Sequence, residues 1–142
     1  MRSAMWRVLG LALAVASVAL GVHGTFAAEM GMADELKTTI THAGYAEKYD
    51  TMKEVGLHLH HVVNCIVGEG DPMFDKASGN PCQGQGKGIM PDLKAKGGMD
   101  QEVQVAWWLA HMASDAAKMG NLAQAKAAGH IIGVQLTAMS KM

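Results

Sequence analysis

Apolar residues recur at steps of three or four over residues 45–66, and this pattern constrains the fold more than any other feature of the chain. Such spacing places side chains from successive turns on one face of an α-helix. The series consists of Tyr45, Tyr49, Met52, Val55, Leu59, Val62 and Ile66. It predicts a long amphipathic helix that ends at Gly68 and buries its apolar face against other helices.

Three other segments also have helical patterns. Residues 33–43 predict a shorter N-terminal helix, and Gly44 either ends this helix or bends one continuous helix. Residues 100–119 and 121–139 predict two long helices on either side of Gly120. No segment has the strict alternation of a β-strand, so the pattern predicts an all-α fold.

Two features predict how these helices pack. The helix at 100–119 has apolar stripes on two faces, one containing Trp107 and the other Trp108, which predicts that it is the most central helix. Small residues at 125, 129 and 133 line one face of the last helix. They predict a close approach by a neighbouring helix.

Residues 68–98 interrupt the helical patterns. This stretch contains eight glycines and all three prolines, a composition that predicts a long loop. Cys65 and Cys82 are the only cysteines, and we expect a disulfide that ties the first half of the loop to the long helix. The predicted fold is therefore a small helical bundle, with three long helices, a short N-terminal helix and a disulfide-tied loop.

The first 27 residues have the pattern of a secretory signal peptide. Arg2 and Arg7 precede an apolar stretch, and Thr25 and Ala27 provide the small residues of a cleavage site. The apolar stretch is too short for a typical membrane span, so we expect no stable membrane insertion after cleavage. Residues 28–142 would then form a single domain in the periplasm or outside the cell, an oxidising location that permits the disulfide.

The charge pattern argues against a nucleic-acid partner. Lys and Arg number 12 against 13 Asp and Glu, so no general attraction to phosphate is expected. Both arginines lie in the predicted signal peptide. The predicted mature chain therefore lacks the side chain best suited to bidentate recognition of phosphates and bases.

A group of histidines near the end of the long helix predicts a metal site. Glu54, His58 and His61 follow one helical edge at steps of four and three, and His60 lies on the other flank. Imidazole and carboxylate groups at this spacing can share one ion of Cu, Zn, Ni or Fe. Further candidate ligands are the loop residues Asp71, Met73 and Asp75 and the helical residues His111 and His130.

The same residues also permit a structural interpretation. Histidines beside a long loop can hydrogen-bond its backbone, and Asn64 is suited to the same role. The protein would then be a module whose loop at 68–98 recognises a periplasmic protein partner. His42, near the predicted end of the first helix, is interpreted as a favourable charge at a helix C-terminus.

A third hypothesis is a b-type haem carried between the helices. His130 with Met32 or Met52 would supply its axial ligands. The sequence has no serine in a nucleophile elbow and no cysteine outside the predicted disulfide, so binding is favoured over hydrolytic catalysis. Metal binding, storage or delivery is the function that the sequence predicts.

Overall fold

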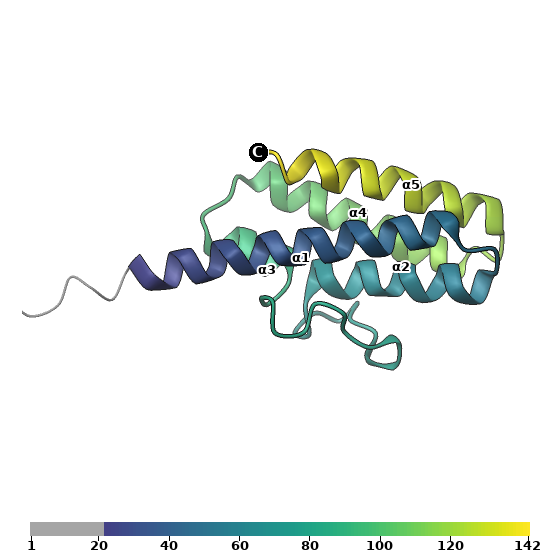
Figure 1. The fold of residues 1–142 in the computed structure, drawn as a ribbon, viewed down its shortest axis with the longest axis horizontal. Helices are drawn as coiled ribbons and strands as arrows, with labels where there is room; N and C mark the ends of the chain where they lie inside the picture. Colours follow the sequence, from purple (N-terminus) through teal and green to yellow (C-terminus); the bar gives the residue numbers. More distant parts are fainter. Residues whose placement is uncertain (1–21) are drawn as a thin grey trace, which may run out of the picture.

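The computed structural model describes residues 22–142, with side chains from residue 31 onward, and every regular element in this part of the chain is helical. Residues 1–21 of the predicted signal peptide lie outside the described residues. Four long helices run side by side along the longest axis of the molecule, and the segment after the second hangs from one side of the bundle (Figure 1). The elements are α1 (Val22–Lys48), α2 (Met52–Val67), the 3-10 turn η1 (Lys76–Ser78), α3 (Ile89–Ala95), α4 (Asp100–Lys118) and α5 (Leu122–Met139).

The first helix is long, contrary to the prediction of a short one. It has 27 residues and continues through Gly44, because a single glycine costs a helix only about 1 kcal/mol. The break between α1 and α2 falls at residues 49–51 instead. There the Thr51 hydroxyl accepts a hydrogen bond from the Glu54 N–H at 3.2 Å and begins α2. The bundle therefore has four long helices rather than three.

The central helix is α2, and the prediction that α4 holds this place is wrong. Nine residues of α2 are buried, and the helix packs against α1, α3, α4 and α5. The second apolar stripe of α4 faces solvent, with Trp108 59% exposed. The buried stripe of α4 consists mostly of alanines, which bring α4 close to α2 without placing α4 at the centre.

The small residues of α5 permit close packing against α1. A Cβ atom on Gly129 would lie 3.0 Å from the Ala46 Cβ and 3.1 Å from the Ala43 carbonyl oxygen. Both positions on α1 are fully buried. The predicted approach of a neighbouring helix is thus seen at the contact between α1 and α5.

Two glycine substitutions should therefore have opposite effects on stability. Gly129→Ala is expected to lower the free energy of unfolding by about 1–2 kcal/mol, because overpacking against α1 outweighs the gain in helix propensity. Gly44→Ala meets no atom within 4 Å and should raise it by about 1 kcal/mol. Urea denaturation of the two variants checks both signs, and a stabilising Gly129→Ala would contradict the packing described.

The predicted loop at 68–98 is partly helical. The Cys65–Cys82 disulfide is present, with a Cα–Cα distance of 5.4 Å, and both residues are buried. Residues 89–95 form α3, because the apolar side chains of Ile89, Met90 and Leu93 are buried against the bundle. Pro91 lies in the first turn of α3, where a helix does not need the missing N–H.

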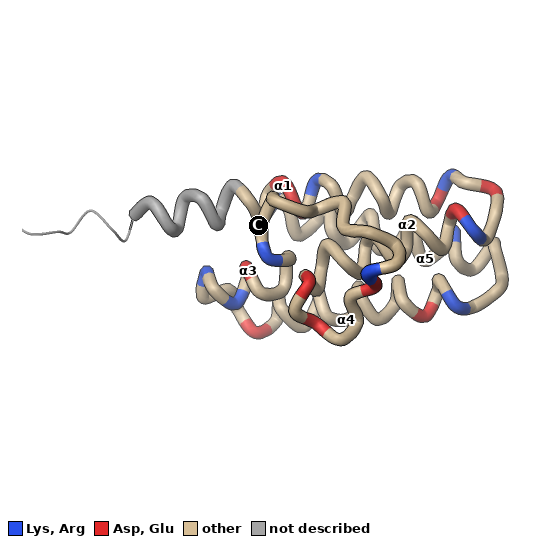
Figure 2. The backbone as a smooth tube through the Cα atoms, turned by 90° about the horizontal axis from the view of Figure 1, so that it is seen from below, with Lys and Arg blue, Asp and Glu red and all other residues tan. Residues whose placement is uncertain are grey.

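Charge is distributed evenly over the described surface. Acidic and basic residues are interspersed along the helices and the connecting segments (Figure 2). Among the helices that the structure describes, none combines the length and the apolar character needed to cross a bilayer.

Candidate metal centre

Three histidines from two helices converge at one place on the bundle. His42 lies near the end of α1, and His58 and His61 lie about one turn apart in α2. The His42 Nδ1 is 2.9 Å from the His58 Nδ1 and 3.2 Å from the His61 Nδ1. One ring nitrogen from each histidine lies within 4.8 Å of the other two, so the group could hold a metal ion. We call these three residues the histidine triad.

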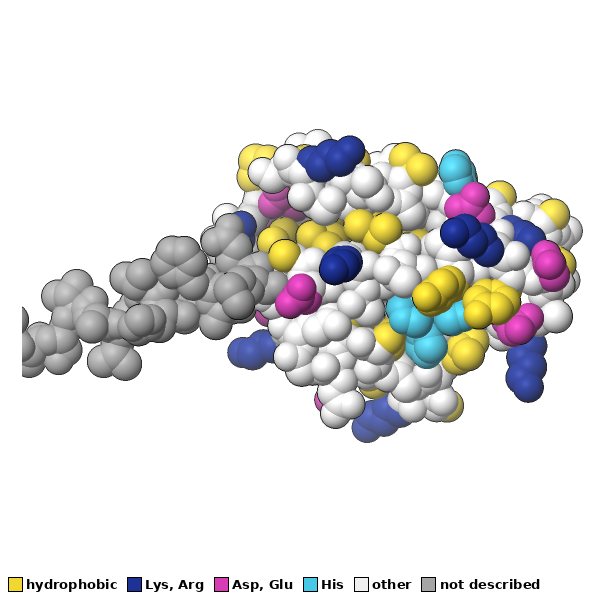
Figure 3. Space-filling model, viewed as in Figure 1, with side chains coloured by type: hydrophobic (Ala, Val, Ile, Leu, Met, Phe, Trp, Pro, Cys, Tyr) yellow, Lys and Arg dark blue, Asp and Glu magenta, His cyan; other side chains and the backbone are white. Residues whose placement is uncertain are grey.

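The triad lies at the surface and is half-buried. All three side chains have intermediate exposure. Histidine side chains gather on the face of the molecule shown in Figure 3, with hydrophobic side chains directly beside them. A small ion could therefore reach the triad from solvent without any opening of the bundle.

A loop carbonyl orients the ring of His61. The His61 Nε2 lies 2.7 Å from the carbonyl oxygen of Ser78. A carbonyl only accepts hydrogen bonds, so the hydrogen of a neutral His61 ring is on Nε2 and the lone pair is on Nδ1. Outer hydrogen bonds of this kind fix the tautomer of metal-binding histidines. His61 therefore presents its lone pair to the other two rings.

The surroundings of His42 and His58 disfavour positive charge on these two rings. Burial, together with the charges of the neighbouring His61 and His58, lowers the pKa of His42 to about 4. Burial and His61 also lower the pKa of His58, although Glu54 opposes this shift. His42 is consequently neutral at pH 7. A metal ion binding there would not have to displace a proton from it.

Two tyrosines enclose His58. The ring of Tyr49 stacks on that of His58, with centroids 5.0 Å apart, and Tyr45 approaches the same ring at 5.0 Å. Tyr45 also contacts His42 edge-on at 5.6 Å. These contacts restrict rotation of both imidazoles, because a ring flip would have to displace an aromatic neighbour.

The lowered pKa of His42 has a consequence for stability in acid. A group with a lower pKa in the folded state is protonated first in the unfolded chain, so stability is full above pH 6.5 and falls as the pH drops towards 4. We expect a loss of about 1 kcal/mol in the metal-free protein, because partial exposure of His42 weakens the effect. In His42→Gln, the free energy of unfolding should depend less on pH between 6.5 and 4. Urea denaturation at several pH values measures this dependence. If the variant keeps the pH dependence of the wild type, the effect does not come from His42.

Asn64 anchors the loop that passes beside the triad. Its side-chain amide donates to the carbonyl oxygens of Asp75 at 2.8 Å and Gly79 at 2.6 Å, and its oxygen accepts from the Asp75 N–H at 2.8 Å. Asn64 itself is 1% exposed. Asn64 therefore binds the loop backbone, as expected. His61 does so as well, through Ser78, and also belongs to the triad.

The structure brings only His58 and His61 of the four main predicted ligands into the triad. Glu54 accepts a hydrogen bond from the Thr51 hydroxyl at 2.7 Å, as part of the helix cap. His60 lies beside Asp75, with 3.5 Å between the His60 Nδ1 and the Asp75 Oδ2. Neither Glu54 nor His60 belongs to the metal-ligand group found among the described residues.

The additional predicted ligands also lie outside the triad. His111 contacts the ring of Trp107, with centroids 3.9 Å apart, and the exposed His130 lies 3.2 Å from a carboxylate oxygen of Glu47. Of the loop residues, Asp71 accepts from a backbone N–H and Asp75 caps η1, while Met73 packs against the hydrophobic core.

The sequence analysis did not identify His42 as a member of the group. The α1–α2 connection is short, and His42 and His58, each eight positions from residue 50, face each other across the two helices. A cap between Thr51 and Glu54 can be read from the sequence, and it would have placed the turn correctly. The interpretation of Gly44 as the end of a helix concealed this pairing.

Comparisons of the chain with protein-family models, with curated proteins and with solved structures gave no match.

Proposed function

We propose that this protein binds one transition-metal ion through His42, His58 and His61 and serves in metal binding, storage or delivery. The convergence of three Nδ1 atoms carries the proposal. Zinc–imidazole bonds of about 2.0–2.1 Å at tetrahedral angles place ligand nitrogens about 3.3 Å apart. The two distances from the His42 Nδ1, 2.9 and 3.2 Å, are close to this value, and the ligand nitrogens of the three rings all lie within 4.8 Å of one another.

The donor atoms favour certain metals. Three imidazole nitrogens suit Zn(II), Cu(II), Ni(II) and Fe(II), whereas Ca²⁺ and Mg²⁺ require oxygen ligands that the triad does not offer. Among the divalent ions of the first transition series, Cu(II) generally binds nitrogen sites most strongly. We therefore expect tight binding of Cu(II) and Zn(II) and no competition from Ca²⁺ or Mg²⁺.

The position of the triad suits binding and transfer of an ion. Three protein ligands leave a coordination position free, and partial exposure gives an incoming ligand access to it. The cavity of about 660 Å³ that Glu35 and Asn64 line does not include the three histidines. An exposed site with one open position can exchange its ion with another carrier.

The proposed location is the periplasm or the extracellular space. The disulfide between Cys65 and Cys82 fits an oxidising compartment. The signal-peptide pattern at residues 1–27 points to the same location. Binding of a protein partner by the 68–98 segment would then serve delivery of the ion.

The haem alternative has less support. The axial histidine that it requires, His130, has a side chain that is 60% exposed and is paired with Glu47. A b-type haem between helices needs a buried imidazole as its ligand.

Titration of the metal-free protein with Zn(II) or Cu(II) tests the proposal. We expect saturation at one equivalent and a melting temperature that rises with metal concentration, because a ligand of the folded state stabilises it. Ca²⁺ at the same concentrations is the matched control and should leave the melting temperature unchanged. Absence of saturable binding of either transition metal, measured by competition with a chromophoric chelator, would refute the proposal.

A further inference from the structure

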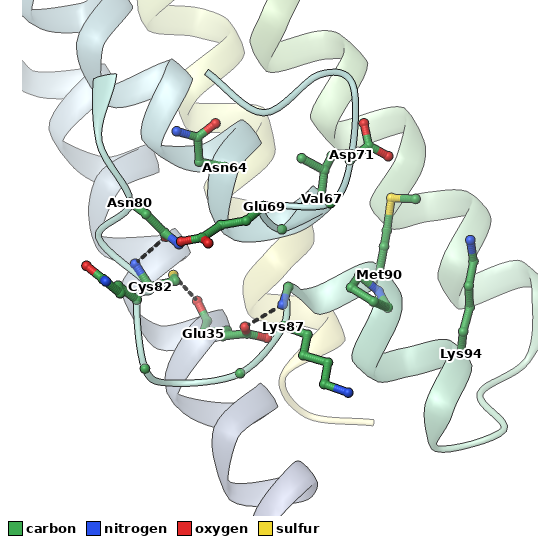
Figure 4. Close-up of a pocket in the computed structure, with 17 residues that line it drawn as sticks. Glu35, Asn64, Val67, Glu69, Asp71, Asn80, Cys82, Lys87, Met90 and Lys94 are labelled. Carbon is green, nitrogen blue, oxygen red and sulfur yellow. Dashed lines mark hydrogen bonds between the residues drawn. The ribbon is translucent and has the colours of Figure 1, made fainter. Parts of the chain in front are cut away.

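Two buried carboxyl groups meet where the glycine-rich segment at residues 83–88 crosses α1. Glu35 comes from α1 and Asp92 from α3, and oxygen atoms of both carboxyl groups lie against Gly86. Figure 4 shows Glu35 beside the segment that carries Lys87, with a hydrogen bond to the backbone of this segment. The pair takes no part in the histidine triad.

The backbone of the segment closes directly over this pair. The Gly88 N–H donates to the Glu35 Oε1 at 2.7 Å, and the Lys87 N–H donates to the Asp92 Oδ2 at 3.2 Å. Gly86 lies so close that a Cβ atom there would overlap oxygen atoms of both carboxyl groups. The two acids are therefore the structural support on which residues 86–88 rest.

The pair is placed where two negative charges would be costly. Glu35 is 1% exposed and Asp92 is 6% exposed. The second carboxyl oxygen of Glu35 is buried and receives no hydrogen bond from any described donor. Two adjacent buried carboxylates repel each other and lose their hydration, whereas a single shared proton removes one charge and supplies the missing donor.

Charged side chains of both signs surround the cavity next to the pair. Lys87 and Lys94 line the cavity next to Glu35, as do the acidic residues Glu69 and Asp71, so the charges around the cavity are balanced. The pKa of Glu35 is raised to about 7, mainly by burial and also by Asp92, while the hydrogen bond from the Gly88 N–H opposes the shift. The packed face of α2 presents the uncharged Asn64 and Val67 to this cavity.

We propose that Glu35 and Asp92 form a proton-operated latch that holds residues 83–88 against α1. When the pair carries one proton, the two carboxyl groups are hydrogen-bonded to each other and support the segment. Loss of this proton leaves two buried carboxylates, whose repulsion releases the Gly88 and Lys87 contacts. Because Glu35, Gly86 and Lys87 all line the cavity of about 660 Å³, release of the segment opens one wall of it.

The latch can be tested on the metal-free protein by NMR, independently of any metal binding. Amide exchange at Gly88 is measured from pH 6 to pH 8 and corrected for the intrinsic rate. We expect the protection factor to fall at least tenfold in the wild type and less than twofold in Glu35→Gln. Glutamine keeps the acceptor for the Gly88 N–H and supplies a permanent donor towards Asp92, so it imitates the protonated pair.

Asp34→Asn is the matched control, because Asp34 is the exposed acid next to Glu35. In Asp34→Asn, the protection factor of Gly88 should fall at least tenfold between pH 6 and pH 8, as in the wild type. A constant protection factor in the wild type, or an equal fall in Glu35→Gln, would overturn the latch. If Glu35→Gln does not fold, Asp92→Asn provides the test. Removing the neighbouring charge should move the midpoint of the Gly88 chemical-shift titration down by at least one pH unit, and an unmoved midpoint would also overturn the latch.

Discussion

Replacing His42 with alanine is expected to weaken Zn(II) binding about 100-fold or more, equivalent to about 2.7 kcal/mol. His42 supplies the Nδ1 that lies close to both other rings, at 2.9 and 3.2 Å, so its removal leaves two ligands without the third. Its pKa of about 4 keeps the ring neutral at pH 7, so protonation does not compete with metal binding there. Competition with a chromophoric chelator measures the loss.

His60→Ala is the matched control for this experiment. His60 lies in the same helix as His58 and His61, but its ring is directed to Asp75. Its removal should change the affinity less than threefold, although the sequence alone makes His60 a candidate ligand. A large loss in His60→Ala with little loss in His42→Ala would show that the ion binds elsewhere. Circular dichroism should confirm that both variants remain helical.

Removing the disulfide is expected to cost about 3 kcal/mol of stability. Cys65 and Cys82 are separated by 17 positions, and a cross-link of this size restricts the unfolded chain by about that amount. The double variant Cys65→Ala/Cys82→Ala avoids free thiols. Urea denaturation of this variant and of the wild type under oxidising conditions measures the difference, and equal midpoints would contradict the role of the bond.

The disulfide also supports the metal site. The segment that it closes carries Ser78, whose carbonyl orients the ring of His61. Asn64 continues to hold the same segment after the bond is removed, through its bonds to Asp75 and Gly79. We therefore expect a fall of only about tenfold in Zn(II) affinity in the double variant, because losing a hydrogen bond that orients a metal-binding histidine typically costs about 10–100-fold.

The fold was predictable where side-chain periodicity or cysteine pairing determines it. The apolar series that includes Leu59, Val62 and Ile66 identified the buried face of α2, and these three residues are fully buried. The disulfide followed from the only two cysteines. The length of α1 did not follow, because a glycine such as Gly44 ends some helices and is tolerated in others. The cap at Thr51 decided the boundary.

The site was predictable only in part, because a metal site depends on contacts between helices. Spacing within α2 brought His58 and His61 together, since both lie on one helical edge. This spacing says nothing of His42, because the position of His42 depends on the angle and register of α1 against α2. Glu54 matched the same spacing, but its carboxylate is engaged by the Thr51 hydroxyl. Local competition of this kind is not visible in a pattern of residue types.

The most direct measurement of the central claim is imidazole ¹⁵N NMR of the protein during titration with Zn(II). We expect the Nδ1 resonances of His42, His58 and His61 to shift together and to saturate at one equivalent. The resonances of His60, His111 and His130 should remain where they were. A saturable shift in the second group, or none in the first, would contradict the assignment of the triad as the metal site.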